Sequence, residues 1–309
     1  MKRRLTEKDI LLLEFLCKYK MMLATDSKKI YKSKDYYLKR LKVLEKEQYI
    51  KRVNRYHIKL DIKGIKLVKE LGFYYHNVCR KEKYQKRVQE IMKIATLTLD
   101  SDIRFLTSWE IKDSNVFTEM GRTFIGLLNY YDGDYIAYYI SKDKSFHYVR
   151  QVINDVNKNI QYNKSVVFME DFKNLNKGNQ YFIFGKKSTL IINPTKENLD
   201  RIRSIQEIDC YDILQQIYKG KEILLSNWNK ADYMTEEKQY ILFMPFIDTE
   251  KLHGLNIAFN NNEKSNRKID IVTLKENKEK IEEILKDVIN IIELDEILKT
   301  KDDINFINN

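Results

Sequence analysis

The sequence predicts a mixed α and β protein, α+β in its first part and α/β in the rest. Apolar residues recur at helical spacing as far as Gln48, and the period then changes to the alternation of half-buried strands. Beyond residue 101, short apolar runs alternate with amphipathic stretches, as in domains built on a central sheet. We therefore predict one domain at 1–75 and another at 101–309, joined by a bridging helix within 76–100.

The composition is typical of a globular chain. Of its 309 residues, 43% are apolar and 12% aromatic, which excludes a disordered protein. Only 9 Gly and 2 Pro occur, which argues against collagen-like repeats and long flexible linkers. No apolar run approaches the roughly 20 residues of a membrane span, and three widely spaced cysteines suit a reducing compartment. We therefore expect a cytoplasmic protein with no membrane partner.

The positive charge of the chain lies near its N-terminus. The whole chain has 56 Lys and Arg against 45 Asp and Glu, a net charge of +11. Residues 1–90 hold 26 basic and 11 acidic residues, whereas residues 91–309 hold 30 and 34. Such asymmetry indicates a polyanionic partner, although a solvated lysine-rich surface has the same composition. The arrangement of the elements decides between the two interpretations.

The first 32 residues predict two helices. Thr6 followed by Asp9 resembles a capping box. The apolar residues behind it have the spacing of a helix over about 7–20, and a brief second helix is expected at 26–30. These two helices begin a compact three-helix unit.

The third helix is predicted to begin near Lys34, with Ser33 as its cap. We place on its buried side Tyr37, Leu38, Leu41 and Leu44, and on its basic side Lys34, Lys39, Arg40, Lys42 and Lys46. A helix of this kind docks its apolar side on the first two helices and enters the major groove of DNA with its basic side. The candidate groove residues are Lys34, Tyr36, Lys39, Arg40 and Lys42.

A basic hairpin and a closing helix follow. Residues 49–53 and 56–60 alternate apolar and polar side chains around a tight turn. The hairpin carries candidate phosphate contacts, Lys51, Arg52 and Arg55. A fourth helix over 62–71 ends at Gly72. Together the elements make a winged helix-turn-helix, for which we favour DNA binding over docking to another protein.

Three segments of the first hundred residues carry a family resemblance. They are Leu5 to Leu13, Leu38 to Leu44 with Tyr49 to Arg52, and Tyr56 to Lys59 with Gly64. These segments resemble the plasmid replication-relaxation family, whose proteins belong to plasmids and mobile elements of mainly Gram-positive bacteria. The resemblance implies replication initiation or a relaxosome role, with double-stranded origin or transfer-origin DNA as partner and host replication or relaxosome proteins beside it.

The rest of the chain predicts a bridging helix and an α/β domain. The bridging helix, over 80–98, has a basic first half that either extends the DNA-binding face or is a solvated connector. Strands are expected at 123–128, 135–140, 165–169, 222–225, 240–246 and 269–274. One further strand is expected at either 181–184 or 190–192. Helices are expected at 146–159 and 196–205, with a final core-packing amphipathic helix at 276–299.

The strand-turn-strand-helix order resembles a degenerate restriction-endonuclease-like core, which we associate with the same family. An active nuclease of this kind needs an acid on one strand and an acid-x-Lys on the next to hold a divalent metal. Asp132 or Asp134 would be the first acid, but in Ile140-Ser141-Lys142 an isoleucine replaces the second. We therefore expect no catalysis and no metal.

Other chemistry lacks its motif. The four histidines are isolated, and no pair of cysteines has zinc spacing. The run from Gly185 to Thr189 lacks the other glycine of a P-loop, because Gln180 stands at its position. We therefore expect no cofactor.

The combined expectation is a DNA-binding replication initiator or relaxosome accessory protein without its own catalysis. Its C-terminal domain would position the protein, pair two copies as a homodimer or recruit host proteins. Two alternatives remain open: a winged-helix transcriptional regulator with a sensing domain, and a metal-dependent DNA nuclease.

Overall fold

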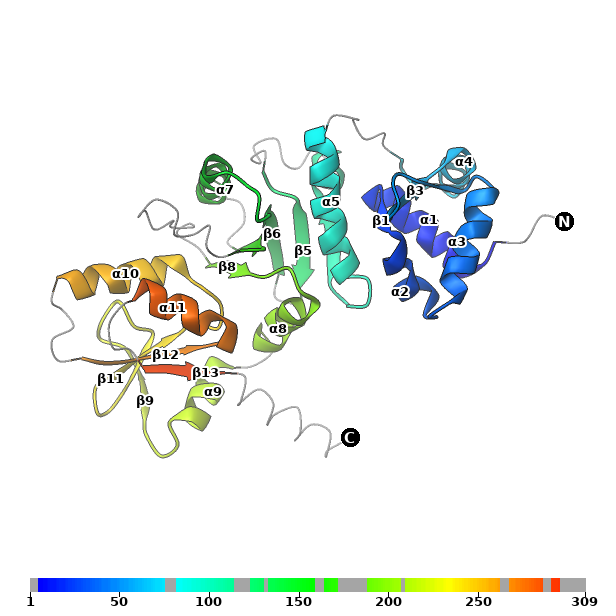
Figure 1. The fold of residues 1–309 in the computed structure, drawn as a ribbon. Coiled ribbons are helices and arrows are strands. Elements are labelled where there is room, and N and C mark those ends of the chain that lie inside the picture. The colour runs from blue at the N-terminus through cyan, green and yellow to red at the C-terminus, as the bar shows by residue number, and fades with distance from the viewer. Residues whose placement is uncertain are drawn as a thin grey trace. The chain divides into compact units, whose positions relative to one another are not determined.

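The protein, analysed as a computed structural model, has a mixed α+β fold with both antiparallel and parallel strands. Figure 1 shows the elements in chain order. The structure describes residues 5–75, 82–113, 123–130, 133–158, 164–171, 188–206, 209–261, 267–285 and 290–294.

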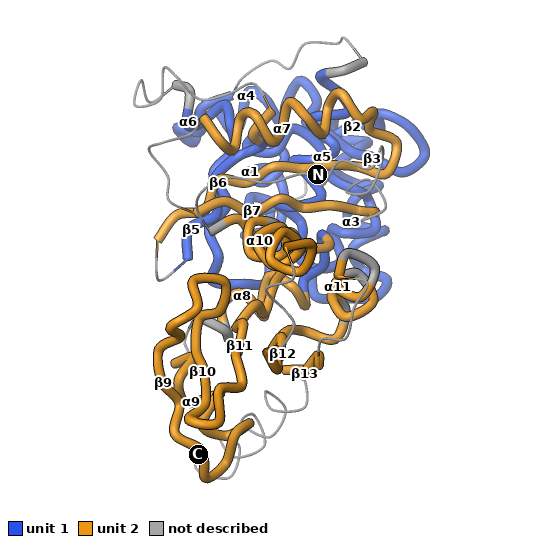
Figure 2. The backbone as a smooth tube through the Cα atoms, turned by 90° about the vertical axis from the view of Figure 1, so that its left-hand side faces the viewer, with its two compact units in different colours: residues 1–119, 125–130, 194–196 blue, residues 120–124, 131–193, 197–309 orange. Residues whose placement is uncertain are grey.

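The chain divides into two compact units, coloured separately in Figure 2. Unit 1 comprises residues 1–119, 125–130 and 194–196, and unit 2 comprises 120–124, 131–193 and 197–309. The first unit therefore continues well past the predicted boundary near residue 75. Independent folding of residues 1–75 stays a prediction.

Unit 1 begins with helices and a small antiparallel sheet of strand order β1-β3-β2. The elements are α1 (Glu7–Tyr19), β1 (Met22–Leu23), α2 (Ser27–Tyr31), α3 (Tyr36–Lys46), β2 (Ile50–Arg52), β3 (His57–Leu60) and α4 (Ile62–Glu70). The predicted helices over 7–20, 26–30 and 62–71 are confirmed to within a residue at each end. The two-residue strand β1, which pairs Met22 with Ile58, was not predicted.

Buried apolar side chains from several of these elements stabilise this part of unit 1. Leu12, Leu13 and Leu16 of α1 are fully buried, as are Leu44 of α3 and Val68 of α4. Burying a leucine side chain contributes about 1.5–3 kcal/mol. The helical periodicity of the sequence therefore corresponds to real packing, and the short helices α2 and α3 depend on it for stability.

The second part of unit 1 contains α5 (Glu82–Leu97), β4 (Arg104–Thr107), α6 (Ser108–Asp113) and β5 (Gly126–Tyr130). β4 and β5 pair antiparallel, with Phe105 opposite Leu128. The predicted bridging helix is confirmed as α5 over its described residues, whereas β4 was not predicted.

Unit 2 contains three parallel strands, β6 (Gly133–Ile140), β7 (Lys164–Met169) and β8 (Ser188–Ile192), with α7 (Phe146–Lys158) between the first two. The strand expected at 190–192 is confirmed as β8. The alternative at 181–184, like Asp132 of the predicted turn, lies outside the described residues.

The remainder of unit 2 is a five-stranded sheet of order β13-β12-β11-β10-β9. Its strands are β9 (Ile223–Leu225), β10 (Tyr233–Thr235), β11 (Gln239–Phe243), β12 (Lys268–Thr273) and β13 (Asn290–Glu293). The helices are α8 (Lys196–Gln206), α9 (Cys210–Ile217), α10 (Thr249–Asn260) and α11 (Lys278–Ile284). Three strands are parallel (β11, β12 and β13), and the other two add antiparallel.

The predicted final helix over 276–299 is wrong. α11 ends at Ile284, and Asn290–Glu293 forms β13, with Ile291 opposite Ile271 and Ile292 opposite Val272. A helical spacing of apolar residues did not distinguish these alternatives, because β-branched side chains also pack well on a parallel neighbour. Tertiary pairing decides the conformation here.

Candidate nucleic-acid interface

The outer side of α3 carries lysines at helical spacing. Lys39, Lys42 and Lys46 are three or four residues apart, so they share one face of the helix. All three are exposed, as is Lys34 just before the helix. None of these four lysines has an ion-pair partner in the part of the chain that the structure describes. Their charges face solvent, available to an external anion.

Arg40 lies on the opposite side, and its predicted place on the basic face is wrong. Only 6% of the residue is exposed. Its Nε and Nη2 donate hydrogen bonds to the two carboxylate oxygens of Asp9, at 2.8 and 2.6 Å. A bidentate arginine–carboxylate pair is strong and geometrically specific. Arg40 therefore belongs to the interior and is no longer a candidate groove residue.

The Asp9 carboxylate connects the first three helices. It is fully buried in α1, binds Arg40 of α3, and accepts a hydrogen bond of 2.8 Å from the hydroxyl of Tyr31 in α2. It also closes the capping box with the N–H and hydroxyl of Thr6, at 2.6 and 2.7 Å. Burial alone raises the pKa of Asp9, but the hydrogen bonds from Arg40, Thr6 and Tyr31 outweigh it and hold that pKa below its usual value. The network fixes which side of α3 faces outward.

The start of α3 exposes two large side chains. Tyr36 is 48% exposed, with its N–H bound to the Ser33 hydroxyl at 3.2 Å and its ring edge-on to Tyr31. Leu38 is 44% exposed, so its predicted place on the buried side is wrong. The buried side of α3 is centred on Tyr37, Leu41 and Leu44, and Leu38 lies outside its border.

The hairpin places three cations beside α3. Lys51, Arg52 and Arg55 are all exposed, as predicted. Lys51 pairs with Asp61 at 2.8 Å, and Arg52 contacts Glu45 of α3 at 3.5 Å. These exposed pairs contribute about 0–1 kcal/mol, so a phosphate can replace the carboxylates at little cost.

The turn of the hairpin is locked by its own asparagine. The Asn54 side-chain oxygen accepts hydrogen bonds from the N–H groups of Tyr56 and His57, at 2.9 and 2.8 Å. Asparagine favours such turns because its side chain mimics the backbone. Arg55 lies over the exposed ring of Tyr56, with 5.9 Å to its centroid. The tip is therefore an ordered basic projection.

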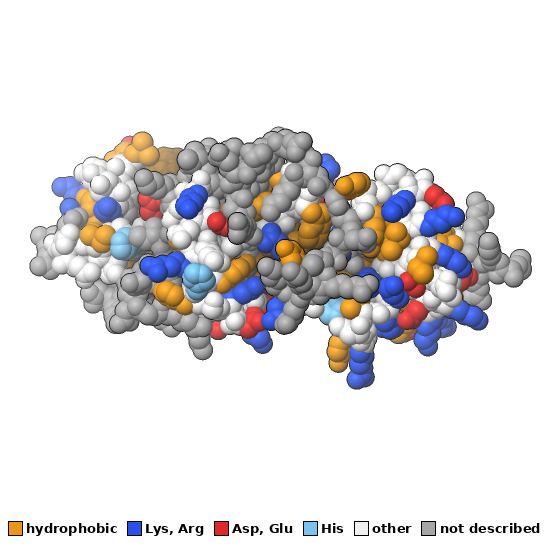
Figure 3. All heavy atoms as spheres, turned by 90° about the horizontal axis from the view of Figure 1, so that it is seen from above, with side chains coloured by type: hydrophobic (Ala, Val, Ile, Leu, Met, Phe, Trp, Pro, Cys, Tyr) orange, Lys and Arg blue, Asp and Glu red, His pale blue; other side chains and the backbone are white. Residues whose placement is uncertain are grey.

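The combined charge of α2, α3 and the hairpin is strongly positive. Residues 27–60 hold 12 Lys and Arg but only 3 Asp and Glu. Figure 3 shows basic side chains over the part of the molecule that contains α1–α4, at the right of the view. Such a concentration attracts polyanions and accelerates their association.

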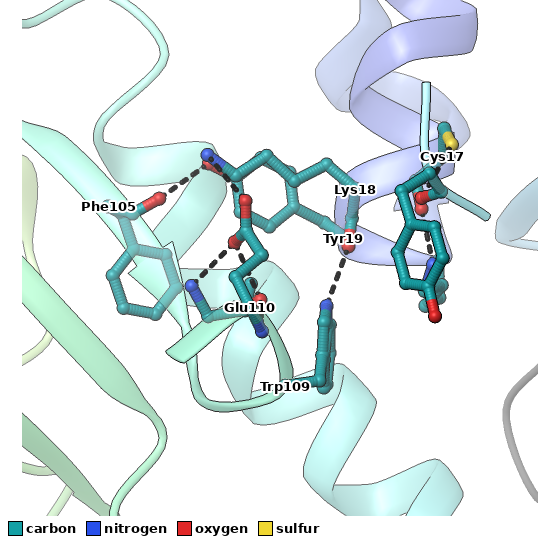
Figure 4. Close-up of polar contacts among 9 residues, drawn as sticks. Cys17, Lys18, Tyr19, Phe105, Trp109 and Glu110 are labelled. Atoms are coloured by element: carbon teal, nitrogen blue, oxygen red, sulfur yellow. Dashed lines mark hydrogen bonds and ion pairs between the residues drawn. The ribbon is translucent and has the colours of Figure 1, made fainter. Parts of the chain in front are cut away.

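α1 is anchored to the second part of unit 1 (Figure 4). The Tyr19 hydroxyl donates to the carbonyl of Phe105 at 3.1 Å, and the Trp109 indole N–H donates to the carbonyl of Lys18 at 3.2 Å. Lys18 also pairs with Glu110 at 3.4 Å. Hydrogen bonds of this kind each contribute about 0.5–1.5 kcal/mol. A fragment of residues 1–75 lacks these partners, so the full chain is the appropriate sample for binding experiments.

A cavity of about 540 Å³ lies beside α1 and α2. Its lining includes Phe15, Tyr19 and Leu99, with Lys18 and Lys29 among its polar residues. Lys18 is engaged by Glu110, and Lys29 donates to the carbonyl of Thr96 at 3.0 Å. These contacts engage two of the three lysines that line the cavity, the third being Lys32, and we assign the cavity no ligand.

The described residues considered for nuclease chemistry lie on β6 and directly after it. Ile140 is fully buried in β6, and the Lys142 backbone N–H donates to Glu170 at 3.1 Å. The described residues contain no group of three or more His, Cys, Asp or Glu side chains that would hold a metal ion. Asp134 is half-buried, and Asp132 lies outside the described residues.

Comparison with known proteins identifies no relative. No protein-family model matches the chain, and neither curated proteins nor solved structures show significant similarity. Among the described helices, none is long and apolar enough to cross a membrane. The functional argument therefore depends on the geometry of the chain itself.

Proposed function

We propose that residues 5–75 form a winged helix-turn-helix that binds double-stranded DNA. The element order α1-β1-α2-α3-β2-β3 and the pairing of β1 with β3 support this fold. In the proposal, α3 enters the major groove and the β2–β3 hairpin contacts the adjacent phosphates. The observation that carries it is the row of exposed lysines on α3, which form no ion pair with any described residue.

The chemistry of this surface favours DNA over a protein partner. Lys34, Lys39 and Lys42 present compact positive charges, and none of the described acidic residues is in ion-pair contact with them. Protein interfaces are depleted in lysine at their centres, whereas lysine and arginine contacts to phosphates supply much of the affinity for DNA. The lysines would provide affinity and orientation, and base contacts would provide specificity.

For the biological role, which the geometry does not specify, we propose the one that the resemblance to the plasmid replication-relaxation family implies. A DNA-binding protein of this kind would bind repeats at a plasmid origin or transfer origin, as a replication initiator or relaxosome accessory protein. The order β6-α7-β7 in unit 2 supports a restriction-endonuclease-like core there. We propose that this domain positions the protein, pairs two copies or recruits host proteins, without catalysis.

The test is duplex binding by the full chain. Sequences are selected from a randomised 30-bp duplex library, and the selected duplex and a scrambled one are then titrated by fluorescence anisotropy at 50 to 200 mM salt. We expect tighter binding to the selected duplex and an affinity that falls steeply with salt. Lys39→Ala should weaken binding to both duplexes alike, since a phosphate contact carries no sequence information.

The matched control is Lys219→Ala, which removes an exposed lysine from unit 2. It should leave binding unchanged. The proposal fails if the full chain binds no duplex, or if Lys219→Ala weakens binding as much as Lys39→Ala does.

A further inference from the structure

We propose that Leu38 recognises thymine, through contact with the C5-methyl group in the major groove. The inference rests on the proposed function, because it concerns how α3 would discriminate among DNA sequences. It assigns a specificity role to a side chain that helical periodicity placed in the protein core. The DNA site would then contain thymine where the first turn of α3 meets the bases.

Leu38 occupies the appropriate position on α3. The helix begins at Tyr36, so Leu38 lies in its first turn. In helix-turn-helix proteins, the N-terminal residues of the recognition helix contact base edges. Lys42 follows four residues later and therefore lies one turn further along the same face. A phosphate held by Lys42 would position Leu38 over the groove.

The orientation of Leu38 is fixed by its neighbours. Tyr37 is 8% exposed and Leu41 is 1% exposed, so the backbone on both sides of Leu38 is anchored in the core. The buried ion pair of Arg40 with Asp9 prevents rotation of the helix about its axis. Leu38, at 44% exposure, therefore presents its apolar surface outward as a rigid feature.

An apolar side chain in this position selects one base. Among the four bases, only thymine presents a methyl group in the major groove. Contact with that methyl removes apolar surface from water, and a buried methyl or methylene group is worth about a fourfold change in affinity, the equivalent of about 0.8 kcal/mol. The lysines beside Leu38 contact phosphates of any sequence. Leu38 thus supplies discrimination that the lysines do not.

Deoxyuridine substitution tests the contact directly, because it removes the thymine methyl and changes nothing else in the base pair. In the duplex selected by the full chain, each thymine is replaced singly by deoxyuridine and affinity is measured by anisotropy. We expect about a fourfold loss at one or two positions and none elsewhere. Leu38→Ala should lose about the same factor on the thymine duplex and show no further loss with deoxyuridine.

Two variants control for nonspecific effects. Leu38→Met retains an apolar side chain and should keep much of the deoxyuridine effect. Leu11→Ala removes a leucine of comparable exposure, 54%, from α1. This variant should show the full loss of affinity on deoxyuridine substitution. Thermal unfolding of each variant confirms that its fold is intact, and the deoxyuridine series on the native chain needs no variant.

The possible failures are distinguishable. If the full chain binds no duplex, the proposed function falls and the inference falls with it. If it binds selectively but tolerates deoxyuridine at every position, only the Leu38 inference is overturned. If Leu38→Ala keeps the full deoxyuridine effect, another side chain contacts the methyl and the assignment to Leu38 is wrong.

Discussion

α3 and α5 are both rich in basic residues, but they use them differently. On α3, Lys39, Lys42 and Lys46 are exposed and have no ion-pair partner among the described residues. On α5, Arg87 donates to the Ser108 hydroxyl at 3.1 Å, and Lys86 and Lys93 also have interaction partners. The number of positive charges on a helix therefore does not show which of them are available to a ligand, whereas their partners among the described residues do.

The same contrast exists within α3. Arg40 and Lys39 are neighbours in sequence, yet one is buried against Asp9 and the other faces solvent. Arginine suits the first role because its planar guanidinium binds a carboxylate in two places, and lysine suits the second as a hydrated point charge. We infer that Arg40 stabilises the fold and that the lysines are available for a ligand.

The largest expected effect comes from Arg40→Ala. Removing one partner of a buried ion pair leaves the other charge uncompensated, which costs about 3–5 kcal/mol. Urea unfolding should be followed by the fluorescence of Trp109 in a Trp228→Phe background, because these are the chain's 2 tryptophans and they lie in different units. Lys39→Ala is the control and should change the free energy of unfolding by less than about 0.5 kcal/mol. Equal effects of the two substitutions would contradict the contrast within α3.

Acid should weaken unit 1 through Asp9. The pKa of its carboxyl is lower in the folded protein than the ordinary value of 3.8. A depressed folded pKa contributes stability that is complete above the unfolded pKa and is lost as the pH falls through the folded pKa. The Trp109 signal should therefore report a falling free energy of unfolding below about pH 4.

Asp9→Asn isolates this contribution. The variant should be less stable at pH 7, because Arg40 loses its counter-ion, and its stability should change less than that of the native chain between pH 5 and pH 2. Parallel pH profiles for the two proteins would show that Asp9 does not carry the acid sensitivity.

A smaller loss of stability is expected where α4 meets the hairpin. A Cβ atom on Gly64 would collide with the backbone carbonyl of Tyr49, which precedes β2. Gly64→Ala must therefore displace α4 from the hairpin, at a cost of about 1–3 kcal/mol. Gly254→Ala in α10 is the control, because its added Cβ makes only ordinary contacts with Lys230 and alanine favours helices. The measurement is the thermal unfolding temperature of each variant. A lower unfolding temperature for Gly254→Ala than for Gly64→Ala would contradict the close approach of Gly64 to Tyr49.

Helical and strand periodicities were sufficient to predict α1, α4 and the hairpin. These elements are short and amphipathic, and each buries its apolar side locally, so the pattern of a dozen residues determines them. The prediction was wrong at β13 because the conformation of this segment depends on its pairing with β12, which lies some twenty residues earlier in the chain. β1 was missed because two residues are too few to show a period.

In the candidate site, too, the sequence pattern did not show how single residues pair in the folded protein. Arg40 lies three residues after Tyr37 and four before Leu44, so strict helical spacing puts it on the buried side, although its charge suggested the opposite. Leu38 is apolar, but it lies outside the buried side of α3. The missing information was Asp9, whose capping role was visible in the sequence and whose pairing with Arg40 was not, because it depends on the packing of α1 against α3.

The contrast between α3 and α5 can be tested with surface substitutions that leave the fold unchanged. Lys39→Ala/Lys42→Ala should reduce the slope of log affinity against log salt concentration by about 2, since each lost phosphate contact removes about one unit. Lys86→Ala/Lys93→Ala removes the same charge from α5 and should leave that slope nearly unchanged. Anisotropy titrations on one duplex at several salt concentrations give both slopes. Equal reductions would mean that the duplex responds to the net charge of unit 1 instead of the exposed lysines of α3, and α5 would then belong to the binding surface.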